Sequence, residues 1–438
     1  MEIMGDQIML NYGYEEEKPL ESSLNCLIYF LAFLLSIAVA ILLLLLGACF
    51  PADAVSQHVR QSADFLVEEG DYPGISDKYD ASILDNWTDA IMLMESMSTS
   101  ISHPETILTN PMFKPTNSLV ESLKLYSNDP SISPTEYYSR YWMGFRVTLR
   151  PALSFLRYYE LRIYNAILLF SLFAALIVSM TKRVGSQASF SFALSWILVR
   201  PHVICNSLQY SNCFLLAFVL MLMIPYISER VRYHSLFFME AGIATMFFDF
   251  YTTPLITFAL PAMYLWLLQK NDGKEYTVRK IVSSFLFWLV GYLFMWIAKL
   301  FLTDLFTSAE GFKYALRAVK HWTLDPVVRQ GDTITPIVTA QRIVTSIIAN
   351  KDGAAIWGSA ALLLLGYLIS SGKNREKYAK NIKNNLAVLI FAALVCLWFI
   401  VTYKPTAVHA AFQYRSVVVA FWANFLMIFY PAKEKETH

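Results

Sequence analysis

The sequence predicts an all-α, polytopic helix bundle embedded in a membrane, with about ten spans and amphipathic helices on one side. Of its 438 residues, 56% are hydrophobic and only 16% are charged. Its mean hydropathy of +0.43 indicates more apolar surface than a soluble domain can bury. Apolar runs long enough to cross a bilayer also recur along the chain. The chain therefore requires a lipid environment, and membrane lipid is its first expected partner.

The first span is predicted over 26–50, after a polar, acidic tail at 1–25. This run of 25 residues contains AILLLLLGACF and is long enough to cross a bilayer with some tilt. A secretory signal peptide would be shorter, and no small-residue cleavage site precedes an ordinary soluble domain. We therefore predict a permanent transmembrane helix.

Further apolar runs predict the remaining spans, which group into residues 161–303 (spans two to seven) and 353–432 (spans eight to ten). The runs lie at roughly 161–180, 187–207, 212–228, 234–250, 254–268, 281–303, 354–371, 385–402 and 413–431. A short tail at 433–438 follows the last one.

The orientation follows from the short connections, because cytoplasmic loops carry an excess of lysine and arginine. On one side the connections hold Lys182, Arg183, Arg230, Arg232, Lys270, Lys274, Arg279, Lys280, Lys373, Arg375, Lys377, Lys380, Lys383, Lys433 and Lys435. The short connections on the other side contain only Lys404. We therefore expect a multi-pass protein of the cell membrane with both termini in the cytoplasm. Two long segments, 51–160 and 304–352, then face outward.

The outward segment 51–160 carries its own helical signals. VSQHVRQSADFLVEE and LDNWTDAIMLMESM have apolar residues at helical spacing, whereas DYPGISDKYD and SNDPSISPTE are typical of loops. We expect amphipathic helices on the outer membrane surface, with an interfacial helix feeding the second span. A solvated extracytoplasmic cap is the alternative.

The chemistry of this segment is concentrated in its LDNWTD motif. Asp85 and Asp89 are four residues apart and so share one helix face. Like charges at this spacing cost roughly a few tenths of a kcal/mol when exposed, but partial burial raises a carboxyl pKa substantially. Beside Trp87, one of the two is a candidate general base. The alternative is that Asp85 caps the helix and Asp89 is solvated.

Ionisable residues also collect near the outward ends of several spans. They are Arg200 and His202 (third span), Asp249 (fifth), Lys299 (seventh), and His409 and Arg415 (tenth). Charges inside a membrane are expensive and tend to mark functional cavities, so this accumulation predicts an anion-binding cavity that opens outward. For each residue alone the alternative is snorkelling to the interface, above all for Lys299.

The second outward segment, 304–352, contributes Arg342 to this set of cations. It also contains Lys313, Arg317 and Lys320 at positions i, i+4 and i+7 of one predicted helix. Such a basic stripe is suited to lipid phosphates, although it is also the ordinary face of a helix at a membrane surface.

This arrangement resembles the GT-C class of integral membrane glycosyltransferases. The resemblance rests on a cytoplasmic N-terminus, an acidic motif in a large outward loop after the first span, and later outward loops bearing Arg, Lys and His. It implies an inverting transfer of a sugar from a polyprenyl-phosphate carrier to an extracytoplasmic glycan, lipid or protein. It also implies that Asp85 or Asp89 is the base, and we prefer Asp85. The candidate donor-phosphate ligands are Arg200, His202, Lys299, Arg342, His409 and Arg415, with Trp87 and Asp249 as further site candidates.

Other features exclude some partners and leave two further functions open. A net charge of +1 argues against a nucleic-acid partner, and no glycine-rich phosphate loop indicates a nucleotide donor. The five cysteines form no CxxC pair, so no metal site is predicted, and dependence on a divalent metal stays open. A polysaccharide polymerase or ligase acting on lipid-linked oligosaccharides would share the outward arginines. A transporter is disfavoured, since no internal repeat is found and the charges favour one face.

Overall fold

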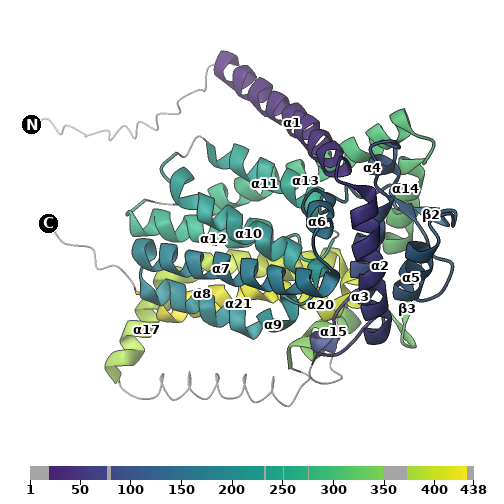
Figure 1. The fold of residues 1–438 in the computed structure, drawn as a ribbon. Coiled ribbons are helices and arrows are strands. Elements are labelled where there is room, and N and C mark those ends of the chain that lie inside the picture. The colour runs from purple at the N-terminus through teal and green to yellow at the C-terminus, as the bar shows by residue number, and fades with distance from the viewer. Residues whose placement is uncertain are drawn as a thin grey trace, which may run out of the picture.

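The computed structural model describes residues 19–75, 80–230, 233–249, 251–274, 276–348 and 372–431. Helices dominate these ranges, which confirms the all-α prediction (Figure 1). The strands found there form two short antiparallel pairs. Pro111–Met112 (β1) pairs with Glu136–Tyr137 (β2), and Val328–Arg329 (β3) pairs with Asp332–Thr333 (β4).

Six helices or helical stretches in the described ranges are long and apolar enough to cross a membrane. Four are single helices: α1 (Pro19–Ala48), α7 (Tyr158–Val184), α10 (Leu208–Ile227) and α13 (Val278–Phe306). The fifth joins α17 (Gly372–Asn385), η3 (Leu386–Val388) and α18 (Leu389–Val401), and the sixth joins α20 (Ala410–Gln413), η4 (Tyr414–Val417) and α21 (Val418–Phe429). The chain is thus a membrane helix bundle.

Three further predicted spans are shorter helices. They are α8 (Ser186–Leu198), α11 (His234–Phe248) and α12 (Ile256–Asn271), of 13, 15 and 16 residues. The predicted run 187–207 is not one helix, because α8 stops before Arg200-Pro201 and the short α9 (Pro201–Ile204) follows. A residue before proline is disfavoured in the α conformation, which ends the helix there. The run 354–371 lies outside the described residues, so the count of ten spans remains a prediction.

The connections predicted to be cytoplasmic meet at one end of the bundle, which we call the basic end. The Nζ of Lys270 donates a hydrogen bond to the carbonyl of Asn384 at 2.6 Å. The side-chain amide of Asn271 donates to the carbonyl of Arg183 at 3.0 Å. Three connections far apart in sequence therefore lie on one side, as the charge pattern predicts.

The connections predicted to face outward meet at the opposite end. The side-chain amide of Gln209 donates to the hydroxyl of Thr252 at 2.5 Å, which joins the start of α10 to the α11–α12 connection. Lys404 in α19 (Tyr403–Val408) donates to the carbonyl of Thr323, the last residue of α14 (Gly311–Thr323), at 2.8 Å. The helix α15 (Pro336–Ile348) packs against α19 at this same end.

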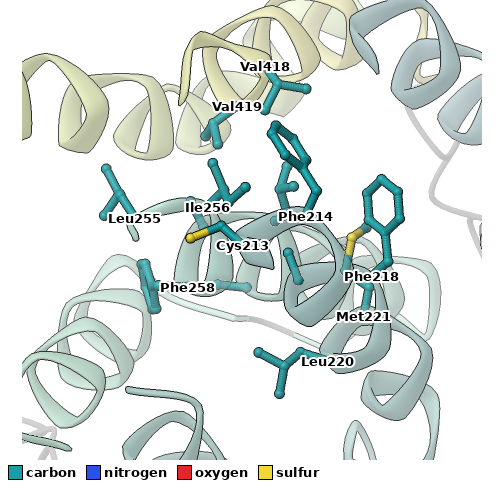
Figure 2. Close-up of a cluster of buried hydrophobic side chains, with 14 of the residues drawn as sticks. Cys213, Phe214, Phe218, Leu220, Met221, Leu255, Ile256, Phe258, Val418 and Val419 are labelled. Carbon is teal, nitrogen blue, oxygen red and sulfur yellow. The ribbon is translucent and has the colours of Figure 1, made fainter. Parts of the chain in front are cut away.

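The apolar core of the bundle lies around α10, α12 and α21. Figure 2 shows Phe214 and Phe218 of α10 near Val418 of α21, with Ile256 of α12 beside them. All four side chains are fully buried. Cys213 lies in this core as a free thiol.

Helices α11 and α13 approach each other through glycine. A Cβ on Gly242 would collide with the carbonyl oxygen of Trp288, and one on Gly291 with that of Met239. Only a residue without a side chain allows this backbone contact, which is a common device in membrane helix packing.

Segment 51–160 folds into a second, smaller core. This core is formed by α2 (Ala52–Glu69), α3 (Asn86–Ser98), α5 (Leu119–Asn128) and α6 (Arg146–Leu153). The short η1 (Asp80–Ser82) and α4 (Thr106–Thr109) of this segment instead pack into the core of the bundle. In Figure 1, α2 and α3 run across the ends of the bundle helices α7, α8, α10, α12 and α21.

The helix α2 is amphipathic as predicted, with Val55, Val59, Ala63 and Leu66 buried on one face. By contrast, α3 is enclosed by α2, α5 and α6, and all its residues from Asn86 to Met97 except Trp87 are buried. The prediction that it lies on a surface is therefore wrong.

Candidate functional site

Asp85 is the residue that caps the start of α3. Its Oδ1 accepts a hydrogen bond from the backbone N–H of Thr88 at 3.0 Å, and its Oδ2 accepts from the Thr88 hydroxyl at 2.7 Å. The side chain is buried, and burial raises the pKa of Asp85 to about 7. The two bonds from Thr88 oppose this rise, whereas the charges of Asp89 and Asp71 add to it. A carboxyl that titrates near neutral pH is suited to accept a proton from a substrate and release it again.

Asp89 serves as an anchor between helices. Its carboxylate accepts hydrogen bonds from the Tyr158 hydroxyl at 2.5 Å, from the backbone N–H groups of Leu208 and Gln209 at 3.0 and 2.8 Å, and from the Ser207 hydroxyl at 3.4 Å. It thereby caps α10, where the unpaired amides of a helix start favour a carboxylate. The alternative reading of the motif is thus right for Asp85, which caps α3, and wrong for Asp89, which is fully buried and not solvated. Asp85 accepts fewer hydrogen bonds than Asp89 does.

The sequence did not predict an ion pair between Arg162 and Glu69 that lies beside the start of α3. Arg162 in the first turns of α7 forms a two-pronged bond with Glu69 of α2, with both N···O distances at 2.8 Å. The same guanidinium donates to Asn86 Oδ1 at 2.9 Å, and the Asn86 amide donates to Glu69 at 2.9 Å. The residue after Asp85 is therefore fixed from two sides. No local pattern links Glu69 and Arg162.

Arg415, which is in η4, also lies near the start of α3. Its guanidinium carbon lies 4.3 Å from the ring centroid of Tyr210, and its Nη2 donates to the carbonyl of Ala81 at 3.2 Å. The Tyr210 hydroxyl donates to the carbonyl of Ile83 at 3.0 Å. Both side chains thus bond to the short segment that leads into Asp85. Arg415 is buried, and its Nε–H has no hydrogen-bond partner among the described residues.

Arg200 and His202 lie close to Arg415. Burial lowers the pKa of His202, and the positive charges of Arg200 and Arg415 lower it further, so this imidazole is neutral at pH 7. Arg200 caps α9 with a left-handed backbone (φ +61°), which is uncommon for a residue with a side chain and is concentrated at functional sites. Its buried Nη1 has no partner among the described residues.

His409 and Arg342 belong to the neighbouring part of this end. Burial, and then the charge of Arg329, lowers the pKa of His409 to about 4. Arg342 donates to the carbonyls of Arg329 at 2.7 Å and Ala407 at 3.4 Å, and lies 3.5 Å from Asp332. Arg342 therefore orders the β3–β4 turn against the segment that carries His409.

Packing brings the residues around Asp85 and Arg415 together with those around His409 and Arg342. The helices α15 and α20 both contact η1, and they contact each other. The charge of Arg329 also reaches Tyr72, where it opposes the rise in pKa caused by burial, Asp85 and Asp71. We call this set the Asp85 cluster, and its members are Asp85, Arg200, His202, Tyr210, Arg329, Arg342, His409 and Arg415.

Lys299 lies outside the Asp85 cluster. It is fully buried in α13 and donates to the Leu108 carbonyl and to the Thr303 hydroxyl, the latter at 3.2 Å. Because its ammonium group does not reach the surface, snorkelling is excluded. It lies close to a buried ion pair between Glu95 and Arg146, with an N···O distance of 3.6 Å. Burial raises the pKa of Glu95 to about 8. Lys299 thus fixes α4 against α13.

Trp87 and Asp249 occupy different positions around the cluster. The Trp87 ring is half-buried and stacks on Tyr72, with centroids 6.2 Å apart and planes inclined by 9°. The Nζ of Lys114 lies 4.8 Å from the Trp87 ring centroid. Asp249 is buried, and both its oxygens accept from the backbone N–H of Thr252 at 3.0 Å. It therefore shapes the turn that contains Tyr251, which has a left-handed backbone (φ +63°).

Within the described ranges, no group of three or more His, Cys, Asp or Glu side chains is arranged to hold a metal ion. Comparison of the chain with protein-family models, with curated proteins and with solved structures gives no match in any of the three.

Proposed function

We propose that this protein is a membrane glycosyltransferase that moves a sugar from a polyprenyl-phosphate carrier to an acceptor hydroxyl at the Asp85 cluster. The observation that carries the proposal is that one titratable carboxyl lies at the same end of the bundle as cations from three distant segments, 200–202, 329–342 and 409–415. Of these cations, Arg415 bonds to the segment that leads into Asp85. The reaction requires both kinds of group, a base for the acceptor and positive charge for the phosphate. In this proposal the cluster faces the outside and both termini lie in the cytoplasm.

In the proposed step, the acceptor oxygen attacks the anomeric carbon of the sugar while the bond from that carbon to the phosphate oxygen breaks. The proton of the acceptor hydroxyl moves to Asp85, and the electron pair of the broken bond stays on the phosphate. A single displacement of this kind inverts the anomeric centre. No redox partner is needed.

Arg415 and Arg200 are assigned to the leaving phosphate. Each has a buried N–H that finds no partner in the part of the chain that the structure describes, and a phosphate oxygen would supply the missing acceptor. His202 and His409, both neutral at pH 7, would act as hydrogen-bond donors or acceptors and not as charges. The arginines would then supply the positive charge that stabilises the leaving phosphate.

The stacked rings of Tyr72 and Trp87 support a carbohydrate acceptor. Tyr72 is 53% exposed, so the stack presents an aromatic edge to the surface within electrostatic reach of Asp85. Aromatic side chains offer a large, rigid contact area with a polar rim, which is suited to a sugar ring. We assign them to acceptor positioning.

The test is transfer of radiolabelled sugar from polyprenyl-phosphate donors by the purified protein, with a lipid and glycan extract as the source of acceptor. Asp85→Asn should reduce transfer by a factor on the order of 10²–10⁴ with donor binding retained. Asp129→Asn, an exposed position in the same segment, is the control and should behave as wild type. Donor that crosses the bilayer without forming a covalent product would indicate a transporter and reject the proposal.

A further inference from the structure

A surface cavity of about 610 Å³ lies where α13 ends and α14 begins. Its lining includes Asp304, Glu310, Lys313, Leu316, Arg317 and Lys320. None of these residues belongs to the Asp85 cluster. In Figure 1, α14 lies on the same side of the molecule as α4 and α5.

The position of this groove relative to a bilayer follows from α13. This helix is a candidate span that ends at Phe306, and α14 begins at Gly311. The groove therefore lies where a span leaves the hydrocarbon region. Exposed Phe301 and Leu305, at 57% and 58%, continue the apolar surface of α13 up to its edge.

The helix α14 has one face on the protein and another that none of the described residues covers. Gly311 and Ala315 are buried against the protein. Phe312, Leu316 and Val319 form a separate row that is 38%, 67% and 43% exposed. An exposed apolar row on a helix beside the end of a span is typical of a helix lying in the membrane interface.

The basic stripe of Lys313, Arg317 and Lys320 lies next to this apolar row. Its three positive charges differ in whether an acidic side chain neutralises them. Lys313 is neutralised by Glu310, with N···O distances of 2.8 and 2.7 Å. Asp304 accepts hydrogen bonds from the backbone N–H groups of Gly311 and Phe312, so its charge is directed at the start of α14. Across the described residues, neither Arg317 nor Lys320 forms an ion pair. Both are exposed and one turn apart.

We propose that this groove binds an anionic glycerophospholipid. Arg317 and Lys320 hold its phosphate, and its acyl chains lie along Leu316, Phe301 and Leu305. The uncompensated pair of cations selects a headgroup with net negative charge over a zwitterionic one. This inference does not depend on the proposed transfer reaction.

The bound lipid would also order part of the Asp85 cluster. The last residue of α14, Thr323, and the nearby Asp325 both accept hydrogen bonds from Lys404, at 2.8 and 2.9 Å. Lys404 is in α19, which leads directly to His409. Fixing α14 in the interface therefore stabilises the segment that carries His409.

The experiment is native mass spectrometry of the delipidated full-length protein titrated with phosphatidylglycerol, with phosphatidylcholine in parallel. Wild type should prefer phosphatidylglycerol, and Arg317→Gln with Lys320→Gln should weaken that binding roughly tenfold to thirtyfold. The charge-conserving pair Arg317→Lys with Lys320→Arg should retain it. Lys313→Gln should have a smaller effect, since Lys313 is already paired.

Three outcomes would overturn the proposal. They are equal binding of phosphatidylcholine, unchanged phosphatidylglycerol binding by the Gln pair, and displacement of the lipid by inorganic phosphate at equal concentration. The last would identify a site for a free anion. None of them decides whether sugar is transferred, which the assay of Asp85→Asn tests separately, so failure here and failure of the proposed function are distinguishable.

Discussion

The guanidinium carbon of Arg415 lies over Tyr210, 4.3 Å from its ring centroid, and both side chains donate to carbonyls of residues 81–83. Two residues separated by nearly half of the chain thus hold the same turn before Asp85. The ring contact and the bonds to the carbonyls of Ala81 and Ala411 hold the guanidinium in place, and with it the Nε–H that has no partner among the described residues.

This relationship predicts that Arg415→Lys fails to replace arginine. Lysine keeps the charge but lacks the planar fork that stacks and donates in two directions. We expect donor binding to weaken at least tenfold, measured by titration of the purified protein with polyprenyl phosphate. Tyr210→Phe keeps the ring and should cost less. Equal donor affinity in wild type and Arg415→Lys would remove Arg415 from the phosphate site.

The pKa of Asp85 predicts the pH profile of transfer. A general base must be ionised, so activity should fall as the pH drops through about 7, the folded-state pKa of Asp85. Thr88→Val removes a bond that lowers this pKa, so its acidic limb should move to higher pH. Asp71→Asn removes a charge that raises it, so its limb should move to lower pH. Shifts of the same sign in both variants would exclude Asp85 as the group titrated.

The burial of Asp89 predicts a defect of stability and not of chemistry. Asp89→Ala leaves two backbone amides of α10 and the Tyr158 hydroxyl without their acceptor. Breaking a buried network of this kind costs roughly 3–5 kcal/mol. The thermal midpoint of unfolding in detergent should fall by several degrees, whereas Asp85→Asn should lower it little. A wild-type midpoint for Asp89→Ala would contradict the anchoring role.

The proposed orientation is tested with single cysteines in a background where the exposed Cys26, Cys49 and Cys396 are replaced by serine. Ser133→Cys and Thr333→Cys are exposed at the end that carries the Asp85 cluster and should react with an impermeant maleimide in intact cells. Ser186→Cys, exposed at the basic end, should react only after permeabilisation. The reverse pattern would put the Asp85 cluster in the cytoplasm.

Hydropathy was sufficient to predict the membrane bundle, and charge asymmetry was sufficient to predict which connections share an end. Both are local quantities that a bilayer imposes on any chain. The full burial of α3 was not predictable in this way, because its spacing of polar and apolar residues also fits a helix with one exposed face. Its polar residue Asn86 is satisfied by Glu69, a partner on another helix.

The candidate site shows the same division. Arg200, His202, Arg342, His409 and Arg415 were chosen because charge near a span end is costly, and the structure gathers them at one end of the bundle. The same rule chose Lys299, which instead bonds to the Leu108 carbonyl in a separate cluster. The energetic cost of burying a charge predicts that the charge has a partner. Which residue is that partner depends on how the helices pack.

The enclosure of α3 also affects how Asp85 would meet a substrate in the proposed transfer. A side chain at the start of a helix that is walled in by α2, α5 and α6, and whose next residue is held by Arg162 and Glu69, has already lost its rotational freedom when the chain folds. In the proposed transfer its orientation would not have to be found again at each turnover, so the entropy of alignment would be absent from the activation barrier. The same rigidity forbids Asp85 from following a displaced substrate. Acceptors of different size would therefore have to adjust their own conformation to bring the reacting hydroxyl to Asp85.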